Sequence, residues 1–173
     1  GLLVPRHRGP FFLTEDRGSE GKIFHLPKFR IVRMDAFHDI RATQKYQHIK
    51  PMESDPANVT KVGAVLKTIY FDELPQLFSI LKGDMSFVGP WPWPLEPYYE
   101  ELEKGIFRKR LIRPGFTGLV QANKGIKDGP SEWVLDFAYI GFMHDERRGW
   151  AKLAFDLRVL TRSTKTVSEG RGL

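Results

Sequence analysis

Two adjacent carboxylates, Asp72 and Glu73, are the residues of this chain best suited to do chemistry. Neighbouring like charges repel each other, so the pair needs a physical reason. Asp72 could cap the helix that follows, with Glu73 in its first turn, because the helix dipole favours both. Alternatively, a divalent cation could join the carboxylates to a phosphate held at the same helix N-terminus. The spacing alone leaves both interpretations open and favours capping.

The helix that must position this pair has the clearest pattern in the sequence. Its apolar residues recur at the spacing of a single helical face, namely Leu74, Leu77, Phe78 and Leu81. Pro75 suits the first turn, where its missing N–H costs little, and Gly83 suits the C-terminal end. We therefore predict a helix that begins at Asp72 and ends at Gly83.

The remaining patterns predict short elements joined by loops. We expect extended segments at 11–13 and 23–26 around a turn within 16–21, and a short strand that follows the loop 113–118 and runs through Val120. We expect helices near 36–47, 60–70, 97–107, 131–145 and 150–160, whereas the four prolines of 87–97 predict an irregular segment. Together these elements predict an α/β fold, a small single domain over residues 1–173 in which amphipathic helices surround a short irregular sheet.

Composition narrows the class of protein. A length of 173 residues predicts one domain, and the absence of Cys excludes disulfides, thiolate metal sites and a cysteine nucleophile. The net charge of +6 and the pI of 9.6 indicate an anionic partner, namely a nucleotide, a phospholipid headgroup or a nucleic acid. The sequence contains neither a P-loop or dinucleotide glycine pattern nor the Gly-x-Ser-x-Gly of serine hydrolases.

Basic residues gather at two places. One cluster fits either a solvated charge run or a phosphate clamp, and consists of Arg108, Lys109, Arg110 and Arg113. Pro114 and Gly115 fix Arg113 in a loop and favour the clamp. Residues 146–173 carry seven Lys or Arg and three Asp or Glu beside an apolar stripe. This combination fits a helix on anionic lipid better than nucleic-acid binding, for which no motif is present, so we expect a membrane-surface partner and no nucleic acid.

One run of residues also carries a family likeness. The segment FDELPQLFSILKGDMSFVGP at 71–90 resembles the signature of the bacterial sugar transferases, which are monotopic polyprenyl-phosphate phosphoglycosyl transferases. The segments 28–30, 113–121, 135–139 and 156–160 resemble further blocks of that family in the same order. The likeness covers about residues 9–172 and is more specific than any single motif above.

The resemblance implies a ping-pong reaction. In this family an aspartate attacks the β-phosphate of a nucleoside diphosphate sugar, here expected to be a UDP-sugar, and releases the nucleoside monophosphate. The phosphosugar bound to the aspartate then passes to polyprenyl phosphate, with Mg²⁺ as cofactor. This is the first membrane step of bacterial glycan assembly, at the cytoplasmic face of the inner membrane. The reaction that the resemblance implies agrees with covalent carboxylate catalysis beside a metal. It therefore reverses the preference for the capping interpretation of Asp72 and Glu73.

Positions carry the family roles over to this chain. Asp72 is expected to be the nucleophile, Glu73 its acidic partner, and both are expected to bind the metal. The residues expected to bind phosphate or substrate are Lys28, Arg30, Lys67, Arg113 and Gln121.

Three departures from the family pattern affect phosphate binding. The arginine expected five residues before the nucleophile is Lys67, and the arginine of Pro-Arg-Pro is Trp91, while Asn-Gly-Arg appears as Asn123-Lys124-Gly125. Lysine cannot reproduce the two parallel bonds of an arginine fork, and tryptophan carries no charge. Phosphate binding could therefore be rerouted through Arg113 or another base. Alternatively, the chain is a catalytically impaired relative that binds nucleotide sugar, lipid or a partner enzyme.

Family members also carry a re-entrant membrane helix just before the segment that matches Gly9–Phe12. From the resemblance we expect that helix to be missing from this chain, with residues 1–8 as the remnant of a truncation. The two tryptophans between prolines, Trp91 and Trp93, are expected to be packing or interface residues, or anchors at a membrane surface.

Overall fold

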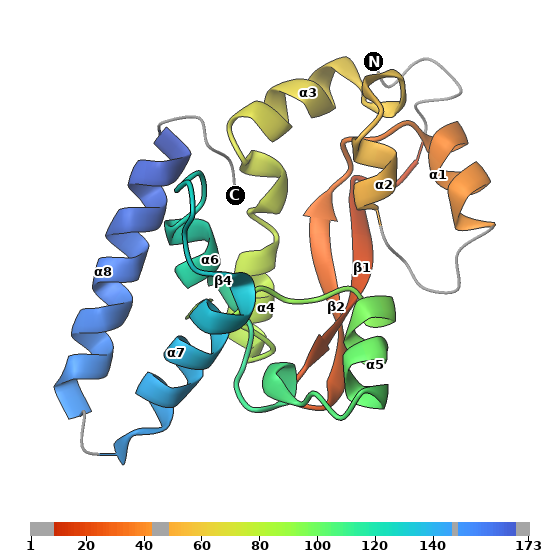
Figure 1. The fold of residues 1–173 in the computed structure, drawn as a ribbon. Helices are drawn as coiled ribbons and strands as arrows, with labels where there is room; N and C mark the ends of the chain where they lie inside the picture. Colours follow the sequence, from red (N-terminus) through yellow and green to blue (C-terminus); the bar gives the residue numbers. More distant parts are fainter. Residues whose placement is uncertain (1–8, 43–48, 147–148, 169–173) are drawn as a thin grey trace.

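The computed structural model describes residues 9–42, 49–146 and 149–168, and the structural statements below concern these residues. Helices of different lengths combine with two small sheets. Figure 1 shows the helices arranged around the first strand pair. The mixed helix and strand class predicted from the sequence is confirmed, but the sheet is two separate strand pairs. The expected remnant at 1–8 lies outside the described residues.

An antiparallel hairpin opens the domain. Strand β1 (Phe12–Ser19) pairs with β2 (Lys22–Phe29), and Ser19 lies opposite Lys22. Glu20 and Gly21 form the turn with φ values of 45° and 81°, the signs that a two-residue type I′ turn requires. The turn predicted over 16–21 is therefore too long, because two residues with positive φ reverse the chain.

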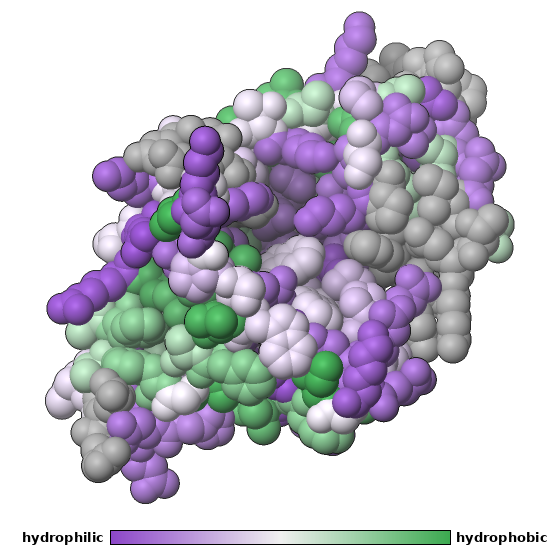
Figure 2. All heavy atoms as spheres, in the orientation of Figure 1, coloured by the Kyte–Doolittle hydropathy of each residue, from purple (hydrophilic) through white to green (hydrophobic). Residues whose placement is uncertain are grey.

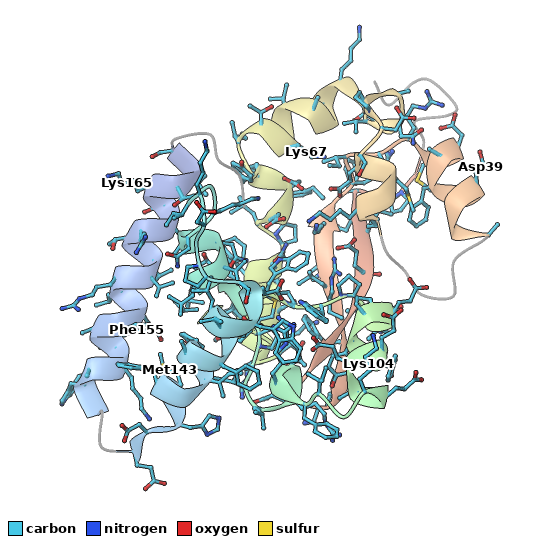
Figure 3. The ribbon with its side chains drawn as sticks, in the orientation of Figure 1. Asp39, Lys67, Lys104, Met143, Phe155 and Lys165 are labelled. Atoms are coloured by element: carbon cyan, nitrogen blue, oxygen red, sulfur yellow. The ribbon has the colours of Figure 1, made fainter. Side chains whose placement is uncertain are left out.

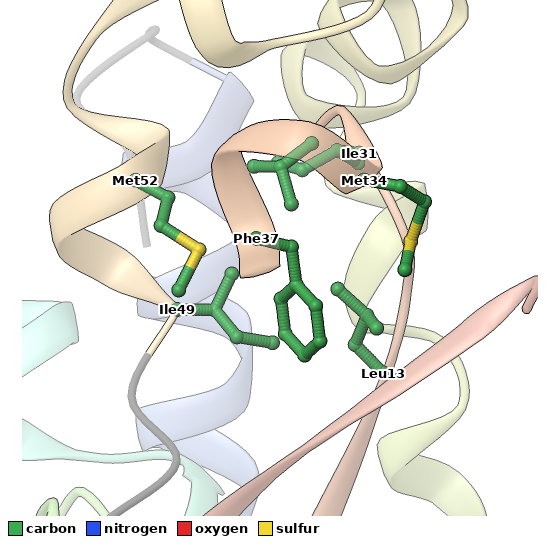
Figure 4. Close-up of a cluster of buried hydrophobic side chains, with 7 residues drawn as sticks. Leu13, Ile31, Met34, Phe37, Ile49 and Met52 are labelled. Carbon is green, nitrogen blue, oxygen red and sulfur yellow. The ribbon is translucent and has the colours of Figure 1, made fainter. Parts of the chain in front are cut away.

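Two short helices pack on the hairpin. They are α1 (Met34–Arg41) and α2 (Lys50–Glu53), followed by the 3₁₀ turn η2 (Pro56–Asn58). The buried cluster that joins them to the hairpin consists of Leu13, Ile31, Val32, Met34, Phe37, Ile49 and Met52 (Figure 4). Burial of each large apolar side chain contributes about 1.5–3 kcal/mol. The helix expected at 36–47 is thus observed at 34–41, and 43–48 lie outside the described residues.

The second sheet is a parallel pair of three-residue strands. Strand β3 (Ser86–Val88) runs beside β4 (Gly115–Thr117). A Cβ atom added to Gly115 would lie 2.0 Å from the backbone N of Gly89, so glycine permits this close approach. The pairing brings the proline-rich loop after β3 beside α6 (Leu119–Ala122). The strand predicted through Val120 is wrong at its end, because the helical turn α6 begins there.

Three further helices follow within the described residues. Helix α5 (Leu95–Glu103) begins two residues before the predicted start, and the 3₁₀ turn η4 (Arg108–Arg110) follows it. The predicted helices near 131–145 and 150–160 are confirmed as α7 (Glu132–His144) and α8 (Gly149–Ser168). Met143 of α7 and Phe155 of α8 pack on a shared cluster that includes Val88 and Tyr139 (Figure 3).

Two residues of the basic run at η4, Arg108 and Lys109, are buried, whereas Arg110 is exposed. Arg108 donates to Asp136 at 2.8 Å and to Glu101 at 2.7 Å. Its guanidinium lies between the rings of Trp93 and Trp133, at 4.6 and 4.5 Å from their centroids. The solvated-run interpretation is therefore wrong for Arg108, and the packing interpretation is confirmed for Trp93.

Several apolar faces point outward. Helix α3 (Lys61–Thr68) and α4 (Gln76–Lys82) leave Val62, Val65, Phe78 and Leu81 exposed, with Leu81 at 83%. On α8 the exposed apolar residues are Trp150, Leu153 and Leu157, while Val159 faces the interior. Figure 2 shows hydrophobic side chains gathered over the α7 and α8 side. Within the described ranges, no helix combines the length and hydropathy needed to cross a bilayer.

Candidate active site

Asp72 lies in a tight turn between two helices. The 3₁₀ turn η3 (Phe71–Glu73) follows Tyr70, whose φ of 55° ends α3 in the left-handed region. The N–H of Leu74 donates to the carbonyl of Phe71 at 3.3 Å and closes the turn. Helix α4 begins only at Gln76, and its N-cap is Pro75, which forms no side-chain cap bond. The capping interpretation and the helix start at Asp72 are therefore wrong.

Two contacts fix this turn against the hairpin. The Phe71 ring stacks on Phe29 of β2 with centroids 6.4 Å apart, and Glu73 faces Lys28 of the same strand at 3.7 Å. Phe71 packs on the hairpin and Glu73 forms an ion pair with it, so Asp72 lies between two anchored residues. Its side chain is buried, with only 4% exposed.

Asp72 and Glu73 line a pocket among α2, α3, η3, α6 and the loop after β3. Its lining residues are Lys28, Lys50, Glu53, Ser54, Lys67, Tyr70, Asp72, Glu73, Trp91, Phe116 and Gln121. Figure 2 shows a hollow near the centre of the view with hydrophilic side chains around it. Four residues predicted to bind phosphate or metal line the pocket together with Asp72, namely Lys28, Lys67, Glu73 and Gln121. Arg30 and Arg113 are not among the lining residues.

The pKa of the Asp72 carboxyl lies above its ordinary value. Burial raises its pKa to about 6, and the negative charges of Glu73 and Glu53 act in the same direction. Lys28 acts against them and lowers the pKa of Asp72. The positive charge of Lys28 therefore does not cancel the effect of burial and of the two neighbouring carboxylates on the pKa of Asp72.

Lys28 is shared between two carboxylates. Its Nζ lies 3.4 Å from Glu15 and 3.7 Å from Glu73. Against the effect of burial, Lys28 and Arg17 lower the pKa of Glu15 to about 2, with help from the N–H of Ile49. Glu15 and Arg17 lie 2.5 Å apart, fully inside the protein. This buried ion cluster anchors the pocket to β1.

The replacement residue Lys67 reaches from α3 to α2, where its Nζ donates to the carbonyl of Glu53 at 3.0 Å (Figure 3). It also lies 3.8 Å from the Glu53 carboxylate. Its charge therefore stays at the pocket wall, paired with an acidic residue that the sequence analysis did not single out.

Two predicted phosphate residues lie away from the pocket lining. Arg113 is half-exposed and faces Glu20 at the hairpin turn at 3.5 Å. Arg30 donates to the carbonyls of Pro10 and Val32 at 2.8 and 2.9 Å. The fixed loop around Arg113 was a correct expectation, but the loop directs this side chain toward the hairpin.

The structure adds pocket residues that sequence patterns missed. They include Lys50, Glu53, Tyr70, Trp91 and Phe116. Trp91 was expected to be a packing, interface or membrane-anchor residue in place of an arginine, and Lys50 and Glu53 belong to a four-residue helix with no periodic signal. A contact between distant segments brings these residues together, and no local pattern records it.

The residues at η3 fit a magnesium ion. Mg²⁺ binds in proteins through one or two carboxylates, with water and substrate phosphates completing its octahedron. Asp72 and Glu73 supply two such carboxylates, whereas no cluster of three or more acidic, His or Cys ligands occurs within the described ranges. The donor set therefore suits a metal that arrives with a phosphate ligand.

Comparison with known proteins gives one consistent family. The sequence profile described as bacterial sugar transferase matches residues 2–170. The chain is 32% identical over 99% of its length to the galactosyl transferase CpsE of Streptococcus agalactiae. It is 33% identical over 88% of its length to a UDP-glucose:undecaprenyl-phosphate glucose-1-phosphate transferase of Xanthomonas campestris. It is 36% identical over 95% of its length to the undecaprenyl-phosphate galactose phosphotransferase of Salmonella typhimurium.

These relatives are longer than the chain. The matches cover 38%, 30% and 34% of the three relatives, so the chain spans about a third of their length.

The raised pKa of Asp72 predicts a pH-dependent effect of Asp72→Asn on stability. Because folding raises this pKa from its ordinary value near 4 to about 6, ionised Asp72 destabilises the folded state. The variant should be more stable than the wild type by about 1–3 kcal/mol at pH 7.5 in magnesium-free buffer. The gain should shrink as the pH falls from 6 to 4. Thermal unfolding of both proteins at pH 4 and at pH 7.5 measures this gain.

Asp128→Asn is the matched control, because Asp128 is exposed on a loop. This control should show no gain that depends on pH. An Asp72→Asn gain that is the same at pH 4 and pH 7.5 would contradict the electrostatic account of the pocket.

Proposed function

The chain belongs to the bacterial sugar transferase family, and from that premise we propose that it transfers a sugar 1-phosphate from a nucleoside diphosphate sugar to polyprenyl phosphate. The observation that carries the proposal is the buried carboxyl of Asp72, raised in pKa beside Glu73 in a pocket that also contains lysines. We infer a UDP-sugar as donor because one relative is named for UDP-glucose.

In the first step ionised Asp72 attacks the β-phosphorus of the donor. A bond forms between a carboxylate oxygen and phosphorus, and the bond from phosphorus to the bridging oxygen breaks. The nucleoside monophosphate leaves with that oxygen and both bonding electrons, so no proton is consumed. Because the pKa of Asp72 is about 6, the carboxyl is mostly ionised above neutral pH and can act as the nucleophile.

In the second step a phosphate oxygen of the polyprenyl phosphate attacks the same phosphorus. The bond to Asp72 breaks, the carboxylate is restored, and the product is a polyprenyl diphosphate sugar. The covalent intermediate replaces one displacement at phosphorus by two successive displacements. In each of them a charged nucleophile is held in place.

The residues around Asp72 have separable roles. Asp72 and Glu73 would hold Mg²⁺, which would neutralise phosphate charge when bound. Lys28 orients Glu73 from β2, and Lys67 contributes positive charge at the pocket wall. Gln121 extends from α6 into the lining, and its buried Oε1 accepts no hydrogen bond from the described residues, so it is available to a donor hydroxyl or amide.

The acceptor is a lipid, and the surface around the site suits a membrane interface. Apolar side chains on α3, η3 and α4 are exposed on both sides of the turn that carries Asp72, including Val65, Ile69, Phe71 and Phe78. A face of this kind lies at the boundary between headgroups and acyl chains. We place the reaction at the cytoplasmic face of the bacterial inner membrane, where the basic helix α8 would also meet anionic lipid.

A second candidate function follows from the replaced arginines. Lys67 is engaged with Glu53, and Trp91 carries no charge, so the chain could bind nucleotide sugar or lipid without turnover. Retained binding of UDP without release of nucleoside monophosphate in the full-length, membrane-embedded protein would favour this alternative.

The covalent step predicts a mass adduct. Incubation of the chain with Mg²⁺ and a panel of UDP-sugars should add one sugar phosphate to its intact mass and release UMP. Asp72→Asn should abolish the adduct and lower UMP release by at least about 10³-fold, because the nucleophile is absent. Asp128→Asn should behave as the wild type. Failure of the wild type to form an adduct or release UMP with any donor would count against the proposal.

The exposed apolar face predicts lipid binding. The chain should co-sediment with vesicles that contain anionic phospholipid at low salt, and Phe78→Glu with Leu81→Glu should reduce the bound fraction several-fold. Phe107→Glu alters a half-exposed ring outside α3 and α4 and should leave binding unchanged. Equal recovery on neutral and anionic vesicles would argue against the basic α8 contact, and no loss in the double variant would argue against the α4 face.

A further inference from the structure

Trp91 occupies a rigid position on the wall of the Asp72 pocket. Prolines at 90 and 92 restrict the backbone on both sides. The carbonyl of Trp91 accepts a bond from Lys109 Nζ at 3.3 Å, and Lys109 is itself paired with Asp136 at 2.8 Å. Because Lys109, paired with Asp136, holds the backbone of the loop, the indole has a defined position.

The ring of Trp91 holds a cation inside the pocket. Lys50 Nζ lies 4.7 Å from the ring centroid, and the guanidinium carbon of Arg17 lies at 5.5 Å. Both distances are within the range of a cation–π contact. Lys50 and Trp91 line the same pocket as Asp72, although they come from α2 and from the loop after β3.

The surroundings of Lys50 favour an anion. Burial, together with the positive charges of Lys28, Lys124 and Arg17, lowers the pKa of the Lys50 ammonium, while Glu53 raises it only in part. The positive charges of Lys28, Lys124 and Arg17 therefore repel the ammonium of Lys50. An arriving phosphate would reduce this repulsion.

We propose that Lys50, positioned by the ring of Trp91, binds the diphosphate oxygens of the nucleotide donor. The aromatic ring of Trp91 holds the ammonium of Lys50 at the wall of the pocket. The inference rests on the proposed donor class. It names Lys50 as a binding residue and Trp91 as a positioning residue that acts through it.

The chemistry explains why both members are needed. A lysine ammonium is a single charge on a flexible stem and loses conformational freedom when it binds. An aromatic face limits the positions of the ammonium, and the N–H donors that do not face the ring can bind an anion. Removal of the ring should therefore weaken phosphate binding only as long as Lys50 is present.

Calorimetric titration of the folded chain with UDP and Mg²⁺ tests this coupling. Lys50→Ala and Trp91→Leu should each weaken UDP binding by about tenfold to a hundredfold, the effect of losing one charge-assisted contact. The double variant should be no weaker than Lys50→Ala alone, because both changes remove one interaction. Trp91→Phe and Lys50→Arg should stay close to the wild type, and Trp91→Arg should restore binding in the Lys50→Ala background.

Lys104→Ala, at an exposed position after α5, is the matched control and should bind UDP as the wild type does (Figure 3). Thermal unfolding of each variant separates a lost contact from a lost fold. Unchanged UDP binding in Lys50→Ala would overturn the inference. Additive losses in the double variant would also overturn it, because Trp91 would then contact the donor directly.

A parallel titration with farnesyl phosphate in detergent distinguishes the acceptor from the donor. Weakening confined to farnesyl phosphate would overturn the inference, since Lys50 would then serve the lipid substrate. The adduct assay is independent of these titrations. UDP binding that follows the expected pattern in a chain that forms no adduct would leave Lys50 in place and reject only the transfer reaction.

Discussion

The contact of Lys28 with two carboxylates determines the charge balance of the site. Its ammonium lies between Glu15, deep in the hairpin, and Glu73 at the mouth of the pocket. Arg17 and Lys28 together balance Glu15 and Glu73, and Asp72 is left buried without an ion-pair partner among the described residues. A buried charge without a partner is costly, so Asp72 holds its proton more tightly than usual until a further cation arrives.

The rest of the fold keeps that arrangement rigid. The Phe71–Phe29 stack holds η3 to the hairpin, and the close approach of Gly89 to Gly115 holds the proline-rich loop against β4. Arg108, enclosed by two indoles and two carboxylates, fixes the same loop from behind. A site with preorganised groups gains rate because its parts need not be ordered when the substrate binds.

Sequence patterns predicted the elements better than their orientation. The spacing of apolar residues found α3, α7 and α8, since a helical period is local. The same spacing could not tell that Leu81 and Trp150 face outward, because a period identifies a face without saying what covers it. The burial of Arg108 depends on Glu101 and Asp136, which are 7 and 28 residues away, so its local charge run resembled a solvated surface.

The sequence predicted the two carboxylates of the candidate site but not the residues that surround them. Adjacent carboxylates and the family likeness pointed to Asp72 and Glu73, and both line the pocket. Arg113 lies outside the pocket lining, because a rigid loop does not specify the direction of its side chain. Lys50 and Trp91 meet only through the packing of α2 against the loop after β3, a contact that neither segment encodes alone.

The pKa of Asp72 tests most directly whether this buried carboxyl lacks a cation until metal and nucleotide bind. The carboxyl carbon of Asp72, assigned with Asp72→Asn and followed by ¹³C NMR, can be titrated with and without Mg²⁺ and UDP. We expect the pKa of Asp72 to be about 6 in the free chain and to fall by at least about one unit when the metal and nucleotide bind. A pKa near its ordinary value of about 4 in the free chain, unchanged by Mg²⁺ and UDP, would contradict it.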